Sequence, residues 1–187
     1  MKRRDVLHGL AAGGLFGFLS GRAAAAKPAD MKAVKALQEN WKTFLPDGLA
    51  VPKPTDPLKL SDAEWRKRLD KMQYYVLRDE GTEGAGTSPL NDEKRAGVFV
   101  CAGCALPVYT SEMKYESGTG WPSFFTTIPG VFATKTDFKI ILPRTEYHCV
   151  RCGGHHGHVF DDGPPPTGKR WCNNGVALKF VPKSGNA

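Results

Sequence analysis

Four of the five cysteines form two Cys-x-x-Cys pairs, Cys101–Cys104 in "CAGC" and Cys149–Cys152 in "CVRC". Two thiolates at one tight turn can bind a metal ion, and two such turns supply the four sulfur ligands of a tetrahedral zinc site. Because four thiolates leave no coordination position for water, this zinc would stabilise the fold and not act on a substrate. Disulfides and a thioredoxin-like redox pair are the alternatives, and iron could replace zinc.

The fifth cysteine, Cys172, has no paired partner and lies in "GKRWCNNG" between Arg170 and Asn174. A lone cysteine in a β-prone segment is usually a small buried hydrophobe. Here a nearby guanidinium can lower the pKa of the thiol by stabilising the thiolate, and the asparagine amide can orient a polar group of a substrate. The segment therefore predicts a nucleophilic thiol with its orienting groups beside it.

Three histidines precede this cysteine in "HHGHVFDDG", namely His155, His156 and His158. Imidazoles titrate near neutral pH and can move the protons that a thiol reaction requires. A second metal site is the alternative, but only Asp161 or Asp162 lies near enough in the sequence to complete it. We therefore interpret the histidines as groups that assist Cys172.

A tryptophan is presented by a Gly/Pro-rich loop in "KYESGTGWPSFF". Trp121 is either a core anchor, as Phe124 would be, or the wall of a pocket for a small apolar group such as a methyl.

The elements that must position these groups are mostly strands. From Gly81 onward, short β-prone runs alternate with glycine- and proline-rich turns, which predicts a mainly β, antiparallel domain. Helical spacing over residues 29–44 predicts a short amphipathic helix, and a capping box at Ser61–Glu64 predicts a second helix that runs to about Gln73. We expect residues 27–80 to form a helical extension that packs on a zinc-containing β domain, residues 81–187, and residues 27–187 to fold as one unit.

Residues 1–26 have the features of an export signal. Basic residues precede an apolar segment from Val6 to Leu19, and small residues end at Ala26. The pair Arg3–Arg4 before a glycine-rich segment favours the twin-arginine type, with a Sec signal or an uncleaved anchor as the alternatives. We therefore predict cleavage after Ala26 and export to the bacterial periplasm, with zinc loaded in the reducing cytoplasm beforehand.

The charge of the chain is partly a property of this signal. Removing residues 1–26 deletes four basic residues and one acidic residue, which lowers the formal charge from +7 to +4. No aromatic-studded basic tract remains, so nucleic-acid binding is not favoured. No apolar run approaches the ~18 residues of a membrane span, so we expect no stable membrane association after cleavage.

From about Gly81 to Phe180 the chain resembles the B-type methionine sulfoxide reductases, the peptide-methionine (R)-S-oxide reductases. The resemblance is carried by "CAGC", "KYESGTGWPSF", "CVRCGGHHGHVFDDGPPPTG" and "KRWCNNGVALKF" in this order. It implies reduction of the R epimer of protein-bound methionine sulfoxide, because one enzyme class serves each epimer. It also implies two antiparallel sheets with short N-terminal helices, and one structural zinc per chain.

The resemblance assigns roles to individual residues. Cys172 matches the nucleophile, which would become a sulfenic acid, and Trp121 matches the residue that contacts the sulfoxide methyl. The four paired cysteines match the zinc ligands. The remaining site residues implied by the match are His155, His158, Asp162, Arg170 and Asn174.

Three positions depart from the family pattern. His156 stands where an apolar residue is usual, so we assign it no catalytic role, and Gly175 stands where serine is common. Thr119 occupies the place where many members carry a resolving cysteine. With four cysteines assigned to zinc and one to the nucleophile, we predict that an external thiol, thioredoxin-like or of low molecular weight, reduces the enzyme. A zinc-stabilised, non-catalytic peptide-binding module is the alternative function.

Overall fold

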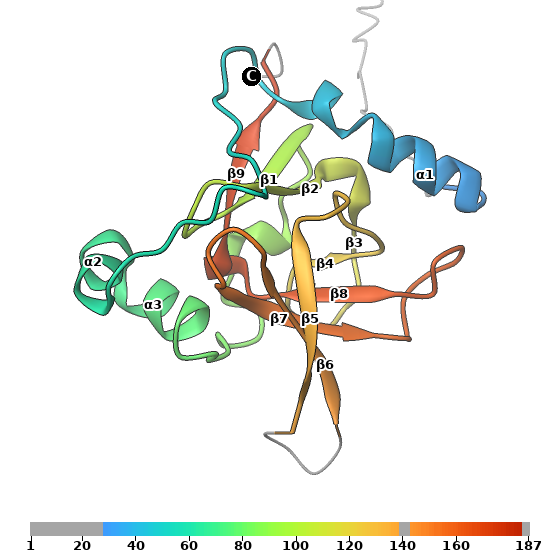
Figure 1. The fold of residues 1–187 in the computed structure, drawn as a ribbon. Helices are drawn as coiled ribbons and strands as arrows, with labels where there is room; N and C mark the ends of the chain where they lie inside the picture. The colour runs from blue at the N-terminus through green and yellow to red at the C-terminus, as the bar shows by residue number, and fades with distance from the viewer. Residues whose placement is uncertain (1–27, 139–142, 185–187) are drawn as a thin grey trace, which may run out of the picture.

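The computed structural model describes residues 28–138 and 143–184. The predicted fold class is confirmed: the chain is mainly β, with two antiparallel sheets and short helices (Figure 1). The N-terminal part holds the α-helices α1 (Met31–Glu39), α2 (Asp62–Arg68) and α3 (Lys71–Leu77), and short 3-10 turns are η1 (Trp41–Phe44), η2 (Pro89–Asn91), η3 (Ser111–Met113) and η4 (Gly175–Ala177). The strands are β1 (Gly97–Cys101), β2 (Pro107–Thr110), β3 (Lys114–Tyr115), β4 (Ser123–Phe124), β5 (Phe132–Asp137), β6 (Arg144–Cys149), β7 (His155–Phe160), β8 (Arg170–Asn173) and β9 (Leu178–Pro182).

The second predicted helix is two helices. The capping box at Ser61 and Glu64 is present and starts α2, but the chain leaves the helix at Leu69, whose backbone is extended. The prediction that this helix runs to Gln73 was therefore wrong. A second capping box, between Asp70 and Gln73, begins α3 in a new direction. The break allows both Trp65 of α2 and Leu77 of α3 to enter the core.

The first predicted helix is also shorter than expected. Asp30 caps α1, which ends at Glu39, and residues 41–44 form the 3-10 turn η1. In Figure 1, α1 lies on one side of the sheets and α2 and α3 lie on the other.

The strands form a three-stranded sheet, ordered β2-β1-β9, and a six-stranded sheet, ordered β3-β4-β8-β7-β6-β5. Strand β8 lies inside the larger sheet, between β4 and β7. Strands β5 and β6 form a long hairpin that extends beyond the rest of the sheet (Figure 1). The position of β8 is what brings Cys172 next to residues from two other strands.

One face of the larger sheet packs on an aromatic core. Tyr109 of β2 stacks on Phe124 of β4 with ring centroids 3.7 Å apart, and Phe99 of β1 contacts the edge of Phe124 at 5.1 Å. Phe132 and Tyr147 continue the core along β5 and β6. Because side chains alternate along a strand, Cys172 and Arg170 of β8 lie on the opposite face.

The predicted signal, residues 1–26, lies outside the described residues. Within the part of the chain that the structure describes, we find no helix long and apolar enough to cross a membrane.

Candidate active site and metal centre

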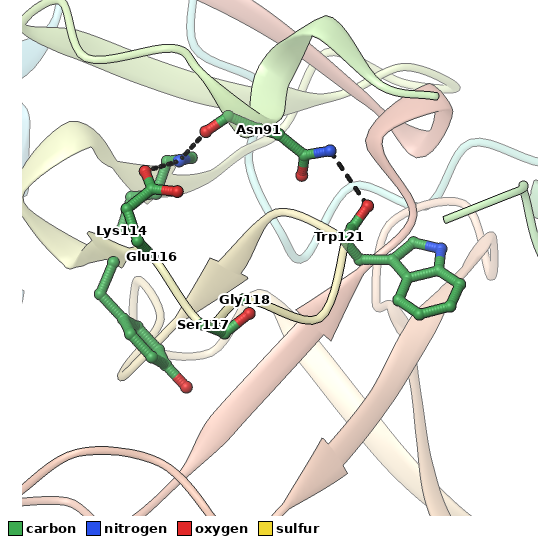
Figure 2. A pocket seen from close by; sticks show the side chains of 8 residues that line it. Asn91, Lys114, Glu116, Ser117, Gly118 and Trp121 are labelled. Atoms are coloured by element: carbon green, nitrogen blue, oxygen red, sulfur yellow. Dashed lines mark hydrogen bonds and ion pairs between the residues drawn. The ribbon is translucent and has the colours of Figure 1, made fainter. Parts of the chain in front are cut away.

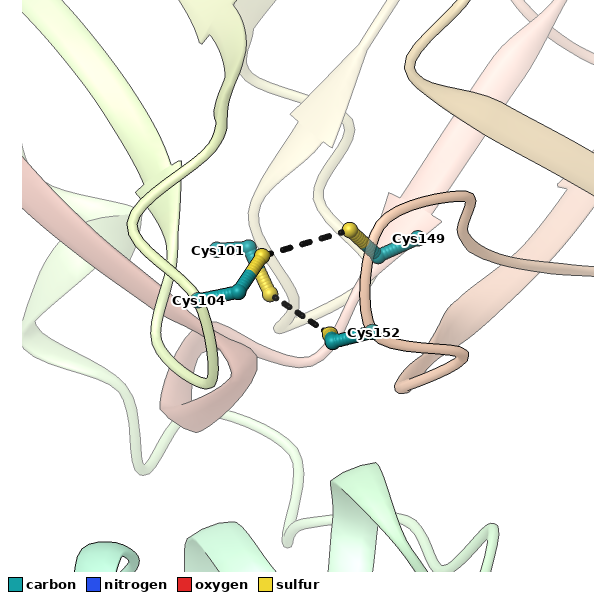
Figure 3. Close-up of side chains that lie close together, drawn as sticks. All are labelled: Cys101, Cys104, Cys149 and Cys152. Carbon is teal, nitrogen blue, oxygen red and sulfur yellow. Dashed lines mark hydrogen bonds between the residues drawn. The ribbon is translucent and has the colours of Figure 1, made fainter. Parts of the chain in front are cut away.

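The four paired cysteines converge on one point (Figure 3). Their sulfur atoms all lie within 4.8 Å of one another, with Cys101 and Cys152 at 3.7 Å and Cys104 and Cys149 at 3.6 Å. Zinc–sulfur bonds of 2.3 Å in a tetrahedron place the sulfurs about 3.8 Å apart, whereas a disulfide requires ~2.05 Å. The cluster therefore has the spacing of a tetrahedral metal site, and no disulfide joins these residues.

Two similar turns present these sulfurs. One connects β1 to β2 and the other connects β6 to β7, and each has a residue with positive φ just after its second cysteine, Ala105 at 60° and Gly153 at 68°. Arg151 donates to the Cys104 carbonyl at 3.0 Å, and Arg78 donates to the Cys152 carbonyl at 2.8 Å. The centre is thus braced by the chain on both sides, including the end of α3.

Cys172 lies apart from this cluster, in the middle of the larger sheet. It is directly opposite His158 of β7 and directly opposite Ser123 of β4. Directly opposed residues of antiparallel strands project to the same face, so His158 and Ser123 flank the thiol. Cys172 is partly exposed, while the four clustered cysteines are buried.

The thiol of Cys172 experiences opposing effects. Burial raises its pKa, while the Arg170 guanidinium and a hydrogen bond from the Thr119 hydroxyl lower it. Burial prevails, so the pKa of Cys172 is above its ordinary value. Arg170 therefore lowers the pKa of the Cys172 thiol as expected, but the effect of burial is larger.

Arg170 is held firmly by Asp162. Two hydrogen bonds of 2.8 Å join the guanidinium to the carboxylate, and Arg170 is 8% exposed. These hydrogen bonds lower the pKa of Asp162 and raise that of Arg170. The guanidinium also lies over the Phe160 ring at 4.3 Å. The sequence-predicted pair Asp162 and Arg170 is thus brought together beside Cys172.

His155 and His158 contact each other although they are three residues apart. An irregularity of the β6–β7 pairing at Tyr147/His148 brings their ring centroids to 5.4 Å. His155 Nδ1 hydrogen-bonds Glu146 at 2.7 Å, and His158 Nε2 hydrogen-bonds Asp137 at 2.7 Å. Among the described residues, His155 Nε2 is buried without a hydrogen-bond partner.

The pKa values of Glu146 and His158 are both shifted. Burial raises the pKa of Glu146, but hydrogen bonds from His155 and His148 outweigh it, so the net shift is downward. Glu146 therefore holds the His155 ring as a carboxylate. Burial lowers the pKa of His158 despite the opposing effect of Asp137.

His156, to which we assigned no catalytic role, is fully buried. Its Nδ1 hydrogen-bonds Asn173 Oδ1 at 3.2 Å, and burial lowers its pKa to about 4. It packs against Phe132 in the core, with ring centroids 5.0 Å apart. His156 is therefore a neutral core residue.

Trp121 lies at the end of a turn that borders a pocket of ≈ 270 Å³ (Figure 2). Lys114 lines the same pocket and hydrogen-bonds the Asn91 carbonyl and Glu116. An adjoining pocket of ≈ 280 Å³ shares Glu116 and extends to Thr119 and Arg170. The two pockets share the lining residues Tyr115, Glu116 and Ser117, with Trp121 at the first pocket and Arg170 at the second.

Asn174 is buried and points away from free solvent. Its Oδ1 accepts a hydrogen bond from the Glu83 backbone at 2.9 Å, and its Nδ2 donates to the His156 carbonyl at 2.9 Å. The structure therefore places Asn174 in the framework that supports Cys172.

Sequence reasoning missed three residues of this region. Glu146 and Asp137 support the histidines, and Glu83 contacts Asn174. No local motif marks them, since each meets its partner through pairing of distant segments.

The geometry defines a class of protein: a mainly β domain in which one isolated cysteine, opposite a histidine and beside an Arg–Asp pair, is separate from a four-sulfur centre. The SelR domain model matches residues 69–182, so the match includes α3 as well as the strands.

Named relatives agree with this match. "Peptide methionine sulfoxide reductase B1, chloroplastic" of Oryza sativa subsp. japonica is 49% identical over 129 residues, which cover 68% of this chain and 60% of that protein. The protein of the same name from Arabidopsis thaliana is 47% identical over 72% of this chain and 67% of its own length. "Peptide methionine sulfoxide reductase MsrB" of Hahella chejuensis is 47% identical over 71% of this chain and 96% of its own length. The chain belongs to the SelR-domain family of peptide methionine sulfoxide reductases, which are oxidoreductases that act on sulfur.

Proposed function

We propose that this chain reduces the R epimer of protein-bound methionine sulfoxide to methionine, with Cys172 as the nucleophile. The observation that carries the proposal is the position of Cys172, directly opposite His158 and beside the Arg170–Asp162 pair, on the face of the larger sheet that is turned away from the aromatic core. The family match supports the reaction class.

The proposed chemistry balances in two steps. The Cys172 thiolate attacks the electrophilic sulfoxide sulfur, a proton reaches the sulfoxide oxygen, and a bond forms between the two sulfurs. The hydroxyl group then moves to the Cys172 sulfur while the substrate S–O bond and the bond between the sulfurs break. Methionine leaves and Cys172 becomes a sulfenic acid; the sulfoxide gains the two electrons that the thiol loses. Two thiols of an external donor then reduce the sulfenic acid to the thiol, and a disulfide of the donor and water are formed.

The surrounding residues have separate tasks in this proposal. The pair His155 and His158 supplies the proton, and His155 is favoured as the donor because its Nε2 is not held by another described residue. Arg170, fixed by Asp162, stabilises the thiolate. Asn174 orients the loop beyond the nucleophile, and Trp121 receives the sulfoxide methyl.

The four clustered cysteines would hold one structural zinc ion. Their spacing fits zinc, and all four sulfurs are committed to the cluster. The ion would cross-link the two turns and would take no part in the reaction.

The test of this function is an assay that resolves the two epimers. Peptides that contain R- or S-methionine sulfoxide are incubated with the enzyme and dithiothreitol, and methionine is measured by chromatography. We expect turnover of the R epimer and none of the S epimer. Equal turnover of both, or of S alone, would contradict the proposal.

We further propose that an external thiol recycles the enzyme, because Thr119 leaves Cys172 without a second cysteine. The Thr119 hydroxyl lowers the pKa of the Cys172 thiol, so this side chain lies beside the proposed reacting atom. After one turnover without reductant, we expect mass spectrometry to show one dimedone adduct, on Cys172, with zinc retained. The matched variant Thr119→Cys should instead form a disulfide between the introduced thiol and Cys172. An intramolecular disulfide in the wild type would refute the external route.

Export through the twin-arginine route is also our proposal, and it is supported by the pattern of residues 1–26 alone. Because that route carries folded proteins, it would permit zinc loading before export. Substituting Arg3 and Arg4 together by lysine is expected to retain the protein in the cytoplasm of a bacterial host. Fractionation and immunoblotting measure the outcome, and periplasmic recovery of the double variant would indicate another route.

A further inference from the structure

Glu83 is a buried carboxylate in the segment between α3 and η2. It is 3% exposed, and its two oxygens accept hydrogen bonds from backbone amides, Gly175 at 2.5 Å and Val176 at 3.0 Å. Within the described residues, no lysine or arginine forms an ion pair with it. A buried charge is costly unless it is well hydrogen-bonded, so these two amides fix the place of the side chain.

The backbone of the same residue makes two further contacts with the proposed site. Its N–H donates to Asn174 Oδ1 at 2.9 Å, and its carbonyl accepts from Trp121 Nε1 at 3.2 Å. Asn174 in turn donates to the carbonyl of His156 on β7. Glu83 therefore joins the Trp121 turn to the segment that follows Cys172, although these are more than 50 residues apart in the sequence.

The glycine after Asn174 makes room for this segment. A Cβ at Gly175 would lie 1.8 Å from the Ser88 hydroxyl oxygen and 3.2 Å from Glu83 Oε1. Gly175, where serine is common in the family, thus permits close docking of residues 83–88. The segment also docks on the Trp121 turn, since the Gly86 amide donates to the Gly120 carbonyl at 2.8 Å.

We propose that Glu83 is a positioning residue for the sulfoxide reaction. Its carboxylate anchors the segment on the Gly175–Val176 amides, and the anchored backbone sets the Trp121 indole and the Asn174 amide relative to Cys172. The inference rests on the proposed function, in which Trp121 receives the substrate methyl. It adds a residue that acts on the site through Trp121 and Asn174 without touching the substrate.

The test is Glu83→Gln, compared with Glu93→Gln. The glutamine amide group places a donor against a backbone N–H, so the anchor loses one of its two hydrogen bonds. We expect kcat/KM for the R-sulfoxide peptide to fall about 10- to 100-fold, the scale associated with small misplacement of reacting groups, with a rise in KM. Glu93 pairs with Arg95 two residues away, and its substitution should leave both constants unchanged.

A double-mutant cycle separates positioning from general destabilisation. If Glu83 acts through Trp121, the combined variant Glu83→Gln/Trp121→Phe should lose less activity than the product of the two single losses. Multiplicative losses, or a Glu83→Gln enzyme within twofold of wild type, would overturn the proposal. If Glu83→Gln does not fold, Glu83→Asp, which keeps the charge on a shorter side chain, takes its place in the cycle.

An activity-independent readout keeps the inference distinct from the function on which it rests. The protein is labelled with 5-fluorotryptophan and its ¹⁹F NMR spectrum is recorded. The signal of Trp121 is the one that disappears in the Trp121→Phe variant. We expect this signal to shift or broaden in Glu83→Gln and to remain in place in Glu93→Gln. An unchanged resonance overturns the positioning role. A wild-type enzyme without sulfoxide reductase activity would refute the proposed function, and the resonance would still decide whether Glu83 positions Trp121.

Discussion

Replacing Cys172 by serine is expected to lower turnover of the R-sulfoxide peptide by at least about 10³-fold, because a hydroxyl does not ionise near neutral pH and is a far weaker nucleophile than a thiolate. The fold should persist, since Cys172 is partly exposed and separate from the four-sulfur cluster. We expect the melting temperature to change by less than about 2 °C. Steady-state kinetics and thermal unfolding of the same preparation measure both effects.

The pH dependence of the reactivity of the Cys172 thiol is a second measurement on the proposed nucleophile. Because burial raises the pKa of this thiol, the thiolate fraction should be small at neutral pH and should still be increasing above pH 9. The rate of iodoacetamide alkylation of the substrate-free enzyme is expected to follow that rise. Full reactivity already at pH 6 would instead show a lowered pKa.

Retained turnover in Cys172→Ser would favour a different reactive group, and absence of turnover even in the wild type would favour the non-catalytic binding module.

The four-cysteine cluster was predictable from the sequence because each Cys-x-x-Cys pair is a local motif. A Cys-x-x-Cys turn carries both of its ligands within four residues, so each half of the site is visible without knowledge of the fold. The 44 residues between the two halves are spanned by β2 to β6, and only the structure shows how that excursion returns. The mainly β class was likewise visible in the repeated short β-prone runs.

The supporting residues of the thiol site were not predictable in this way. Asp137 and Glu146 reach His158 and His155 because β5, β6 and β7 are neighbours, and the contact between the two histidines depends on one irregularity in the β6–β7 pairing. A shift of register by one residue would turn these side chains to the other face. Register is a property of the assembled sheet, so no short motif encodes it.

The end of α2 illustrates a signal that was present but not used. Asp70 and Gln73 form a capping box as clear as that of Ser61 and Glu64, and an N-terminal cap in the middle of a predicted helix indicates a new helix. The prediction used only the first capping box and extended the helix past Leu69 to about Gln73. Tertiary packing of Leu69, which is 6% exposed, completes the break.

Removal of the metal is expected to have the largest effect on stability. The four clustered cysteines are buried within the same core as Trp65 and Leu77, so the centre links the helices to both sheets. Structural zinc contributes about 10–16 kcal/mol in small zinc domains, which is comparable to the whole stability of an ordinary domain at 5–15 kcal/mol. We therefore expect a strong chelator to lower the melting temperature by more than about 10 °C or to unfold the protein.

The matched comparison is between Cys149→Ser and Cys172→Ser, which make the same chemical change at a clustered and an isolated thiol. Elemental analysis should find one zinc per chain in the wild type and in Cys172→Ser, and less in Cys149→Ser, which should also melt at a lower temperature. Iron in place of zinc would change the metal and leave the structural role intact. Protein without metal whose melting temperature is insensitive to chelator would refute the role, and thiol titration would then reveal whether disulfides hold the two turns together. Since the sulfurs lie at 3.6–3.7 Å, a metal ion joins the turns without displacing them, whereas a disulfide must draw its sulfurs closer by more than 1 Å.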